Sequence, residues 1–249
     1  MNTILVEMKN IQKSFDSKKA LNNADMTLQR GEILGLVGDN GAGKSTLLKV
    51  LAGVLPMDQG TMIMDGKPVQ IPSPRHARAL GIEMVYQDLC LCGNMSIWEN
   101  MFLGRYRTHA LRKRLFPFLD KSCMKAQAGR TLRELGIDLS DMNQPIRTLS
   151  GGEQQAVAIS RCLLFQPRIV LLDEPTASMA AWEQNRVLEM VRKLKAQGCS
   201  VIVVTHNLPE IFEVADRVLV LKKGESIWCG HTVDLTPKSL AQRMFVGKG

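Results

Sequence analysis

Residues 38–46 read Gly38-Asp39-Asn40-Gly41-Ala42-Gly43-Lys44-Ser45-Thr46, and the part up to Ser45 fits the phosphate-binding pattern G-x-x-x-x-G-K-[ST]. Its glycines let the backbone turn several N–H groups toward one ligand. The helix expected from Ser45 onward adds the positive end of its dipole. Lys44 would reach the β- and γ-phosphates of a nucleotide, and the Ser45 hydroxyl would hold Mg²⁺. We therefore expect residues 38–46 to bind the phosphates of a nucleotide together with Mg²⁺.

The sequence on both sides supplies the setting that such a loop requires. Residues 32–37 form an apolar run that predicts a buried strand leading into the loop. Further buried strands are predicted over 168–172 and 200–204, with a helix over 181–197 between them that ends at Gly198. Strands that alternate with helices indicate a parallel sheet with covered faces, so the predicted fold class is α/β.

Two consecutive acids, Asp173 and Glu174, end one of these strands. The carboxyl end of a parallel strand lies at the edge of the sheet where ligands bind. We expect Asp173 to bind Mg²⁺, directly or through water, and Glu174 to polarise an attacking water. Such a pair could instead cap the turn at Pro175, but a neighbouring phosphate loop favours the catalytic interpretation.

Composition places the chain among ordinary globular proteins. It has 249 residues, of which 45% are hydrophobic and 22% charged, and this excludes disorder or a coiled coil as a description of the whole. No apolar run approaches the ~18 residues of a membrane span. The N-terminus lacks the basic and apolar regions of a secretory signal. We therefore expect an intracellular chain that does not itself cross a membrane.

Charge and cysteine content leave several partners open. The net charge of +8 is compatible with nucleic acid, anionic lipid, a phosphorylated ligand or merely a basic surface. Of the six cysteines, the closest pair is Cys90 and Cys92, without the further ligands that a zinc site needs. We expect reduced thiols and no metal site on these cysteines.

The predicted secondary structure changes from mainly strands to mainly helices along the chain. The first part is β-rich, with a hairpin turn at Asp65-Gly66, and strand-like runs then vanish between about 94 and 166, where helical patterns such as 120–135 dominate. We expect one domain over 1–249. Its α/β core would comprise about 1–93 and 167–249, and a helical insert about 94–166 would interrupt it.

A motif within this insert identifies a family. Residues 149–155 read Leu-Ser-Gly-Gly-Glu-Gln-Gln and open a predicted helix. The motif resembles the signature of the ATP-binding subunits of ABC transporters, and the resemblance extends over nearly the whole chain. It implies a P-loop NTPase fold with a RecA-like parallel-sheet core, an N-terminal antiparallel β-subdomain and a helical signature subdomain.

The resemblance also implies roles for single residues. Gln87 matches the family's Q-loop glutamine, which acts in catalysis and enters the shell of Mg²⁺. His206 matches the switch histidine that holds the γ-phosphate, and Phe15 matches the aromatic residue that stacks on adenine. Taken alone, each fits an ordinary structural role. The full set, in family order and spacing with Lys44 and Glu174, favours the catalytic and binding roles.

In the family, two subunits pack head-to-tail, and the signature of one closes on the ATP held by the other. Ser150 is predicted to cap the signature helix, so we expect the amides of Gly151 and Gly152 to be open to an anion. One segment departs from the family pattern, because residues 178–180 read Ser-Met-Ala where Ala-Leu-Asp is usual. The Asp usual at position 180 is replaced by Ala180. In the family this segment crosses the dimer interface and couples the two ATP sites, so we expect turnover with altered cooperativity.

Residues 81–89 and 95–105 together resemble the ATPases of ribose/xylose/fructose-type sugar importers. The resemblance implies an ATP-binding and ATP-hydrolysing motor subunit of a bacterial importer whose cargo is a monosaccharide. Such a subunit would lie peripherally on the cytoplasmic face of the inner membrane. Its partners would be a second copy or a related ATPase subunit, transmembrane permease subunits and, indirectly, a periplasmic solute-binding protein, with no nucleic acid. The alternatives are import of another small solute, an exporter subunit, or a soluble ABC ATPase without a transport role.

Two further features of the insert are open to two interpretations each. A set of apolar residues forms either a groove for a permease helix or the insert's own core: Leu89, Leu91, Met95, Trp98, Met101 and Phe102. A basic cluster is either a membrane-facing loop or a solvated face: Arg105, Arg107, Arg112, Lys113 and Arg114.

Overall fold

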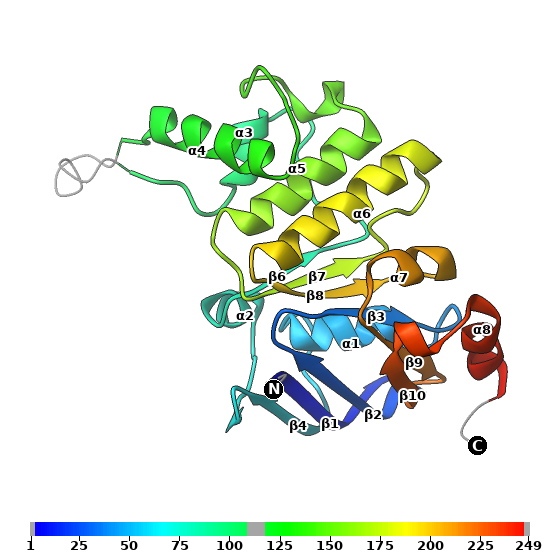
Figure 1. Cartoon of the computed structure of the whole chain (residues 1–249). Helices are drawn as coiled ribbons and strands as arrows, with labels where there is room; N and C mark the ends of the chain where they lie inside the picture. The colour runs from blue at the N-terminus through cyan, green and yellow to red at the C-terminus, as the bar shows by residue number, and fades with distance from the viewer. Residues whose placement is uncertain (1–2, 109–117, 247–249) are drawn as a thin grey trace. The chain divides into compact units, whose positions relative to one another are not determined.

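The structure is a computed structural model that describes residues 3–108 and 118–246 (Figure 1). The chain divides into two compact units. The first comprises Met1–Gln87, Pro167–Ala177 and Val191–Gly249, and the second comprises Asp88–Gln166 and Ser178–Met190. Each unit is described separately below.

The larger sheet of the first unit has six strands in the order β10-β9-β3-β8-β7-β6. All neighbouring pairs are parallel except β10 with β9. The central strands are buried at every residue, which explains why they read as continuous apolar runs. The strands are β3 (Ile33–Val37), β6 (Ile82–Val85), β7 (Ile169–Asp173), β8 (Ser200–Val204), β9 (Arg217–Lys222) and β10 (Glu225–His231).

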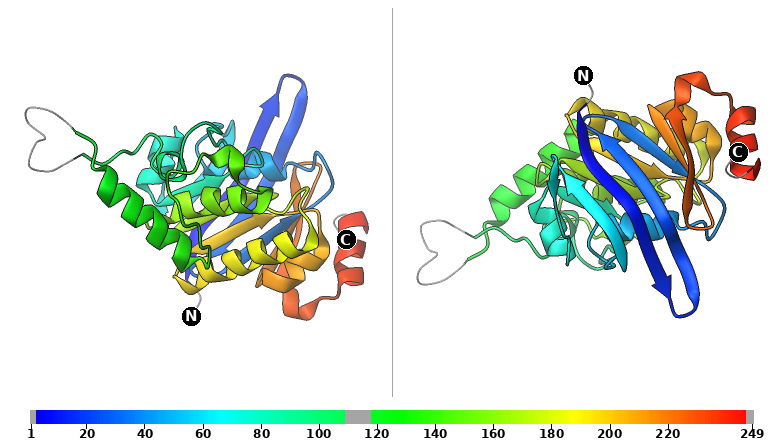
Figure 2. Two further views of the ribbon diagram at one scale, coloured as in Figure 1. Left: turned by 90° about the horizontal axis from the view of Figure 1, so that it is seen from above. Right: turned by 90° about the horizontal axis from the view of Figure 1, so that it is seen from below.

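The second sheet of this unit is antiparallel and has the order β2-β1-β4-β5. Figure 2 shows β1 and β2 as a long blue ribbon of two paired strands. Asp65 and Gly66 join β4 to β5 with positive φ angles of 52° and 73°, the geometry that a two-residue hairpin turn requires, so the predicted turn is confirmed. The strands are β1 (Ile4–Phe15), β2 (Lys18–Gln29), β4 (Gln59–Met64) and β5 (Lys67–Pro68).

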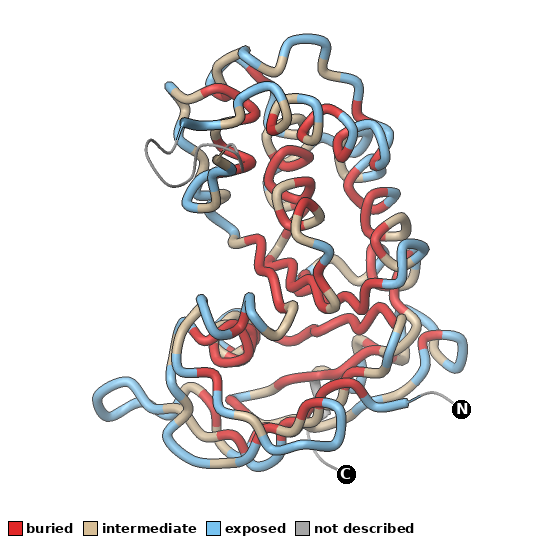
Figure 3. Tube along the Cα trace, turned by 90° about the vertical axis from the view of Figure 1, so that its left-hand side faces the viewer, coloured by how far each residue is buried: buried red, intermediate tan, exposed pale blue. Residues whose placement is uncertain are grey.

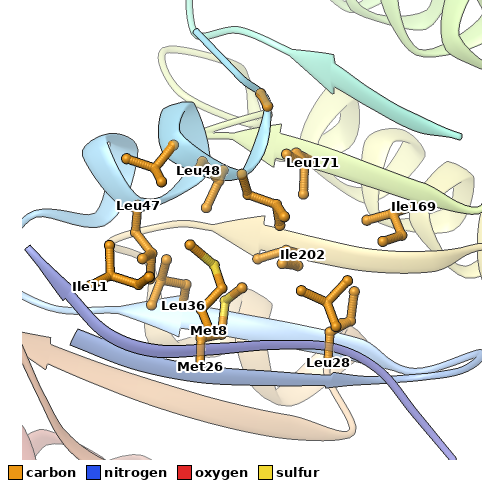
Figure 4. Close-up of a cluster of buried hydrophobic side chains, with 14 of the residues drawn as sticks. Met8, Ile11, Met26, Leu28, Leu36, Leu47, Leu48, Ile169, Leu171 and Ile202 are labelled. Carbon is orange, nitrogen blue, oxygen red and sulfur yellow. The ribbon is translucent and has the colours of Figure 1, made fainter. Parts of the chain in front are cut away.

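The main hydrophobic core of the first unit lies between the two sheets and α1 (Lys44–Leu51). Figure 4 shows side chains from β1, β2, β3, β7, β8 and α1 converging there. Leu36 precedes the phosphate loop and Leu47 and Leu48 follow it, and all three are fully buried. Burial on both sides therefore fixes where the loop begins and ends. The other helices in this unit are α2 (Pro74–Ala79), α7 (Leu208–Val214) and α8 (Pro237–Val246).

The second unit is helical, with α3 (Ile97–Met101), α4 (Lys121–Glu134), α5 (Gly151–Leu163) and the first part of α6 (Ala181–Ala196). Its described residues contain no strand beyond two isolated bridges, as the sequence predicts. Asp120 caps α4 by accepting a hydrogen bond from the Cys123 amide. In Figure 3, buried residues concentrate in strands and on the inner sides of helices, while loops are mostly exposed.

The set of apolar residues in the insert divides between core and surface. Trp98, Met101 and Phe102 are at most 4% exposed, so they belong to the core of the second unit and cannot line an open groove. The ring of Phe102 packs edge-on against Phe165, with their centroids 6.3 Å apart. The other three members, Leu89, Leu91 and Met95, are partly exposed.

The basic cluster is described only in part. Arg105 stacks on the ring of Phe165, 4.0 Å from its centroid, and Arg107 is exposed. Arg112, Lys113 and Arg114 lie outside the described residues. In the described part of the chain, no helix combines the length and the apolar character that crossing a membrane requires.

Candidate nucleotide site

The phosphate loop joins β3 to α1 through glycines that no other residue could replace. Gly38 has a φ of 153°, and a Cβ atom there would lie 2.1 Å from the carbonyl oxygen of Leu221. Gly43 has a φ of 105°, and a Cβ atom there would lie 2.6 Å from the carbonyl oxygen of Ala20. Both positions therefore need glycine for conformation and for space, which keeps the backbone amides close to the cavity.

The side chain of Lys44 folds back over the first residues of the phosphate loop. Its Nζ atom donates hydrogen bonds to the carbonyl oxygens of Gly38 and Asp39, at 2.7 and 3.1 Å. Burial lowers the pKa of the Lys44 ammonium group, against the opposing effect of Glu174 and Asp173. A phosphate that entered the loop would give this partly desolvated cation an anionic partner in place of two carbonyl groups.

A cavity of about 300 Å³ opens over the loop and is lined by residues 40–46 together with Phe15, Lys18, Ala20 and Glu174. Phe15 is 45% exposed, so a planar ligand has access to its ring. A basic side chain, an aromatic ring and the loop amides suit a nucleotide with its phosphates on the loop. The cavity thus brings residues 40–46 of the predicted loop together with Phe15, while Gly38 and Asp39 are not among its lining residues.

Ser45 and Asp173 meet at the inner end of the site. The Ser45 hydroxyl donates a 2.9 Å hydrogen bond to Oδ1 of Asp173, which is only 4% exposed. Burial raises the pKa of Asp173, while the hydrogen bond from Ser45 and the nearby Lys49 oppose that rise. A hydroxyl and a carboxylate oxygen are ligands that Mg²⁺ accepts, so this pair fits the ion beside bound phosphates.

Glu174 and His206 follow two adjacent parallel strands, β7 and β8. Oε1 of Glu174 lies 3.6 Å from Nδ1 of His206, whose side chain is 64% exposed. The amide of Glu174 donates a 2.9 Å hydrogen bond to the carbonyl oxygen of Val204. Glu174 also has a φ of 51°, in the left-handed region that non-glycine residues rarely occupy. Its carboxylate is therefore held at the sheet edge by an uncommon backbone conformation.

Gln87 is exposed and lies two residues beyond β6, the strand that pairs with β7. It thus follows the carboxyl end of a parallel strand, as Glu174 and His206 do. The parallel sheet explains why residues far apart in sequence end at one edge.

The signature residues belong to the second unit. Ser150 caps α5 by accepting a 3.2 Å hydrogen bond from the amide of Glu153, whose carboxylate accepts one from the Ser150 amide in return. The amide of Gly152 donates a 3.1 Å hydrogen bond to Oε1 of Glu183. The expectation that these amides are open to an anion is therefore wrong for Gly152, because a carboxylate of the same chain occupies it.

Comparison with known proteins decides the family. The family model described as ABC transporter matches residues 21–177. The chain belongs to the ABC transporter family. This ABC cassette is 42% identical to the xylose/arabinose import ATP-binding protein XylG of Sulfolobus acidocaldarius, over 90% of the chain and 87% of the relative. It is 40% identical to the fructose import ATP-binding protein FrcA of Rhizobium meliloti, over 93% of the chain and 90% of the relative.

A third relative is longer than this ABC cassette. The ribose import ATP-binding protein RbsA of Caldanaerobacter subterraneus is 40% identical over 98% of the chain, which covers 48% of that relative. The fold also matches solved cassettes. One dimeric ATP-binding cassette, bound to ADP and Pi in a post-hydrolysis state, is 26% identical with a TM-score of 0.78, over 92% of this chain and 99% of that one. The chain is therefore an ATPase of the α/β P-loop class, as the sequence predicts.

Sequence reasoning missed several residues of the ABC cassette's site. Lys18 and Ala20 line the cavity because β1 and β2 form a hairpin, and no local pattern marks them. The position of Glu183 in the sequence does indicate a capping role. This residue lies at the third position of α6, where an acid commonly turns back to cap the first turn.

Proposed function

We propose that the chain is the ATP-hydrolysing motor subunit of a monosaccharide importer. The observation that carries the proposal is the site itself. The glycine loop and Lys44 line one cavity with Glu174, which lies 3.6 Å from His206, and Ser45 is hydrogen-bonded to Asp173. The assignment to sugar import is supported by the two relatives that this chain nearly spans, which are named as import ATP-binding proteins for xylose/arabinose and for fructose.

In the proposed mechanism, Phe15 stacks on adenine and the amides of residues 38–46 hold the phosphates. Ser45, Asp173 and Gln87 would hold Mg²⁺, which would neutralise charge on the β- and γ-phosphate oxygens. Lys44 leaves the carbonyl groups of its own loop and pairs with phosphate oxygen. Catalysis then consists mainly of positioning and charge stabilisation by these groups.

Glu174 would accept a hydrogen bond from the attacking water and orient it toward the γ-phosphorus. His206 would hold the γ-phosphate on the other side of that water, and its 3.6 Å separation from Glu174 suits a pair that acts on one reacting centre. Both residues follow parallel strands of one sheet, which places them at the same edge of that sheet.

The proposed assembly is a head-to-tail dimer in which Ser150, Gly151 and Gly152 of one subunit close on the γ-phosphate held by the other. A solved cassette with 26% identity is dimeric, which supports pairing of this kind. In this proposal Glu183 leaves the Gly152 amide when the phosphate arrives. The whole chain would act as one ABC domain, with the α/β core bearing the nucleotide and the helical insert bearing the signature.

We further propose that the dimer acts on separate transmembrane permease subunits, indirectly serves a periplasmic solute-binding protein, and lies on the cytoplasmic face of the inner membrane. The test is a tagged pull-down from detergent-solubilised membranes of the native host. Co-elution of a multi-span permease with ATPase activity is the expected result. ATPase activity in the soluble fraction without any membrane partner would leave the chemistry standing and overturn the transport assignment.

A further inference from the structure

Glu210 is a buried acid to which the proposed mechanism gives no role. It is the third residue of α7 and is only 5% exposed. A buried carboxylate is expensive unless its oxygens accept hydrogen bonds, so its partners indicate what it does in the fold. All of its hydrogen-bond partners described below belong to the first unit.

The carboxylate of Glu210 joins the two loops that carry the proposed catalytic pair. Its Oε2 atom accepts hydrogen bonds from the Thr176 and Thr205 hydroxyl groups, each at 2.8 Å. Thr176 lies two residues after Glu174, and Thr205 directly precedes His206. Both threonines are at most 4% exposed, so neither hydroxyl group can exchange this partner freely for water.

The second carboxylate oxygen of Glu210 binds Asn207, the residue that follows His206. Oε1 accepts a 3.0 Å hydrogen bond from the Asn207 side-chain amide, and the Asn207 backbone amide donates to the Thr205 hydroxyl at 3.0 Å. His206 thus lies between two residues that are both tied to one carboxylate. Its own side chain is exposed, so packing alone does not fix it.

We infer that Glu210 is a positioning residue for ATP hydrolysis, because it ties the Glu174 loop to the His206 loop and sets the separation of the two side chains. The inference rests on the proposed roles of Glu174 and His206. Glu210 is not among the residues that line the cavity over the phosphate loop. It acts through Thr176 and Thr205, in the way that outer groups orient the residues that touch a reacting centre.

The primary test is Glu210→Leu in the full chain, which keeps the volume near that of glutamate and removes the acceptor. We expect kcat to fall about 10- to 100-fold while the KM for ATP changes less than about threefold, since misplacement of catalytic groups affects turnover more than binding. An unchanged kcat in the folded variant would overturn the inference.

A double-mutant cycle separates positioning from a general structural effect. In a His206→Ala background, Glu210→Leu is expected to lower kcat less than about threefold further, because the pair that it positions is already broken. Full multiplication of the two losses would contradict the inference. If His206→Ala and Glu174→Gln alone leave turnover normal, the proposed function of the site fails first, and this failure is distinguishable.

A second pair of variants covers the case in which Glu210→Leu does not fold. Thr205→Val removes the hydroxyl group at nearly constant shape, whereas Thr205→Ser retains it. We expect the serine variant to keep kcat within about twofold and the valine variant to lose about tenfold or more, in the range of outer groups that orient reacting residues. Equal activity of the two variants would contradict the inference, since the Thr205 hydroxyl group could then have no role in holding the loop that carries His206.

Discussion

Nδ1 of His206 lies 3.6 Å from Oε1 of Glu174, across the ends of two adjacent parallel strands. Neither side chain needs a loop to swing over the cavity in order to meet the other. The two side chains are therefore close enough to act on one bound group. This spacing supports the interpretation that one orients water while the other holds phosphate.

The first prediction concerns Glu174→Gln. Without the carboxylate, the attacking water loses its acceptor, so we expect turnover to fall about 10²- to 10⁴-fold. Nucleotide binding should persist, because the loop and Phe15 are untouched, and the protein should accumulate as an ATP-bound dimer. Phosphate release and size-exclusion chromatography with ATP check this. Glu134→Gln, at the exposed end of α4, is the matched control, and normal hydrolysis by Glu174→Gln would assign the base elsewhere.

The second prediction concerns Glu183, whose carboxylate occupies the Gly152 amide. Glu183→Ala should free that amide for an incoming phosphate. A hydrogen bond to a charged group contributes about 1.5–3 kcal/mol, so we expect the ATP concentration for half-maximal dimerisation to fall by about tenfold. Analytical ultracentrifugation across an ATP titration measures it. Weaker dimerisation would mean that Glu183 supports the signature helix and does not compete for it.

The third prediction concerns Ala180, whose carbonyl oxygen accepts the first hydrogen bonds of α6 from Glu183 and Gln184. Ala180 thus holds the N-cap position but offers no side-chain acceptor. Ala180→Ser should stabilise the chain by about 1 kcal/mol, whereas Ala180→Val should not. Thermal melting of both variants tests this.

The same position bears on cooperativity. Because the family's interface Asp is absent here, Ala180→Asp should alter the Hill coefficient and the ATPase rate of the assembled transporter. If both stay as in the natural chain, the segment at 178–180 has no part in coupling the two ATP sites.

The sequence predicted most of the first unit because its signals are local. Buried strands such as 200–204 read as apolar runs, and the glycine pattern of the phosphate loop spans only residues 38–45. The contacts that were missed are distant in sequence. Glu183 lies 31 residues from Gly152, and Glu210 lies 34 residues from Thr176. No periodicity reports such a pairing, because it exists only after the chain has folded.

The apolar residues of the insert are a second case in which the sequence alone did not decide between two interpretations. Their spacing fitted both a groove and a core, and only burial could decide between them.

The fourth prediction follows from the 4% exposure of Trp98. Trp98→Ala should lower the free energy of unfolding by about 3–5 kcal/mol. Leu103→Ala, at a position 40% exposed, should change it by less than about 0.5 kcal/mol. Denaturant titration compares them, and equal stabilities would restore the groove interpretation.

The fifth prediction concerns pH and the cap of α3. Hydrogen bonds from the hydroxyl and amide groups of Ser96, at 2.6 and 2.9 Å, lower the pKa of Glu99. The ionised form is favoured in the folded chain. Its contribution is therefore complete above the ordinary glutamate pKa of about 4.3 and is lost as pH falls through the lowered pKa.

Glu99→Gln retains a residue able to cap the helix but does not titrate. The stability difference between the natural chain and this variant should thus be constant near neutral pH and shrink in acid. Urea unfolding at several pH values measures it. A difference that stays the same from pH 7 to pH 3 would contradict the assigned cause.

The φ of 51° at Glu174 has a consequence for how this protein could change over time. An L-residue in that region is disfavoured by roughly 1–2 kcal/mol, and glycine is not. Selection for thermal endurance alone would therefore favour glycine at position 174, and selection for turnover would favour the acid. In natural lineages or laboratory libraries selected only for stability, we expect glycine to replace Glu174. The resulting cassettes would be more stable and would bind ATP without hydrolysing it.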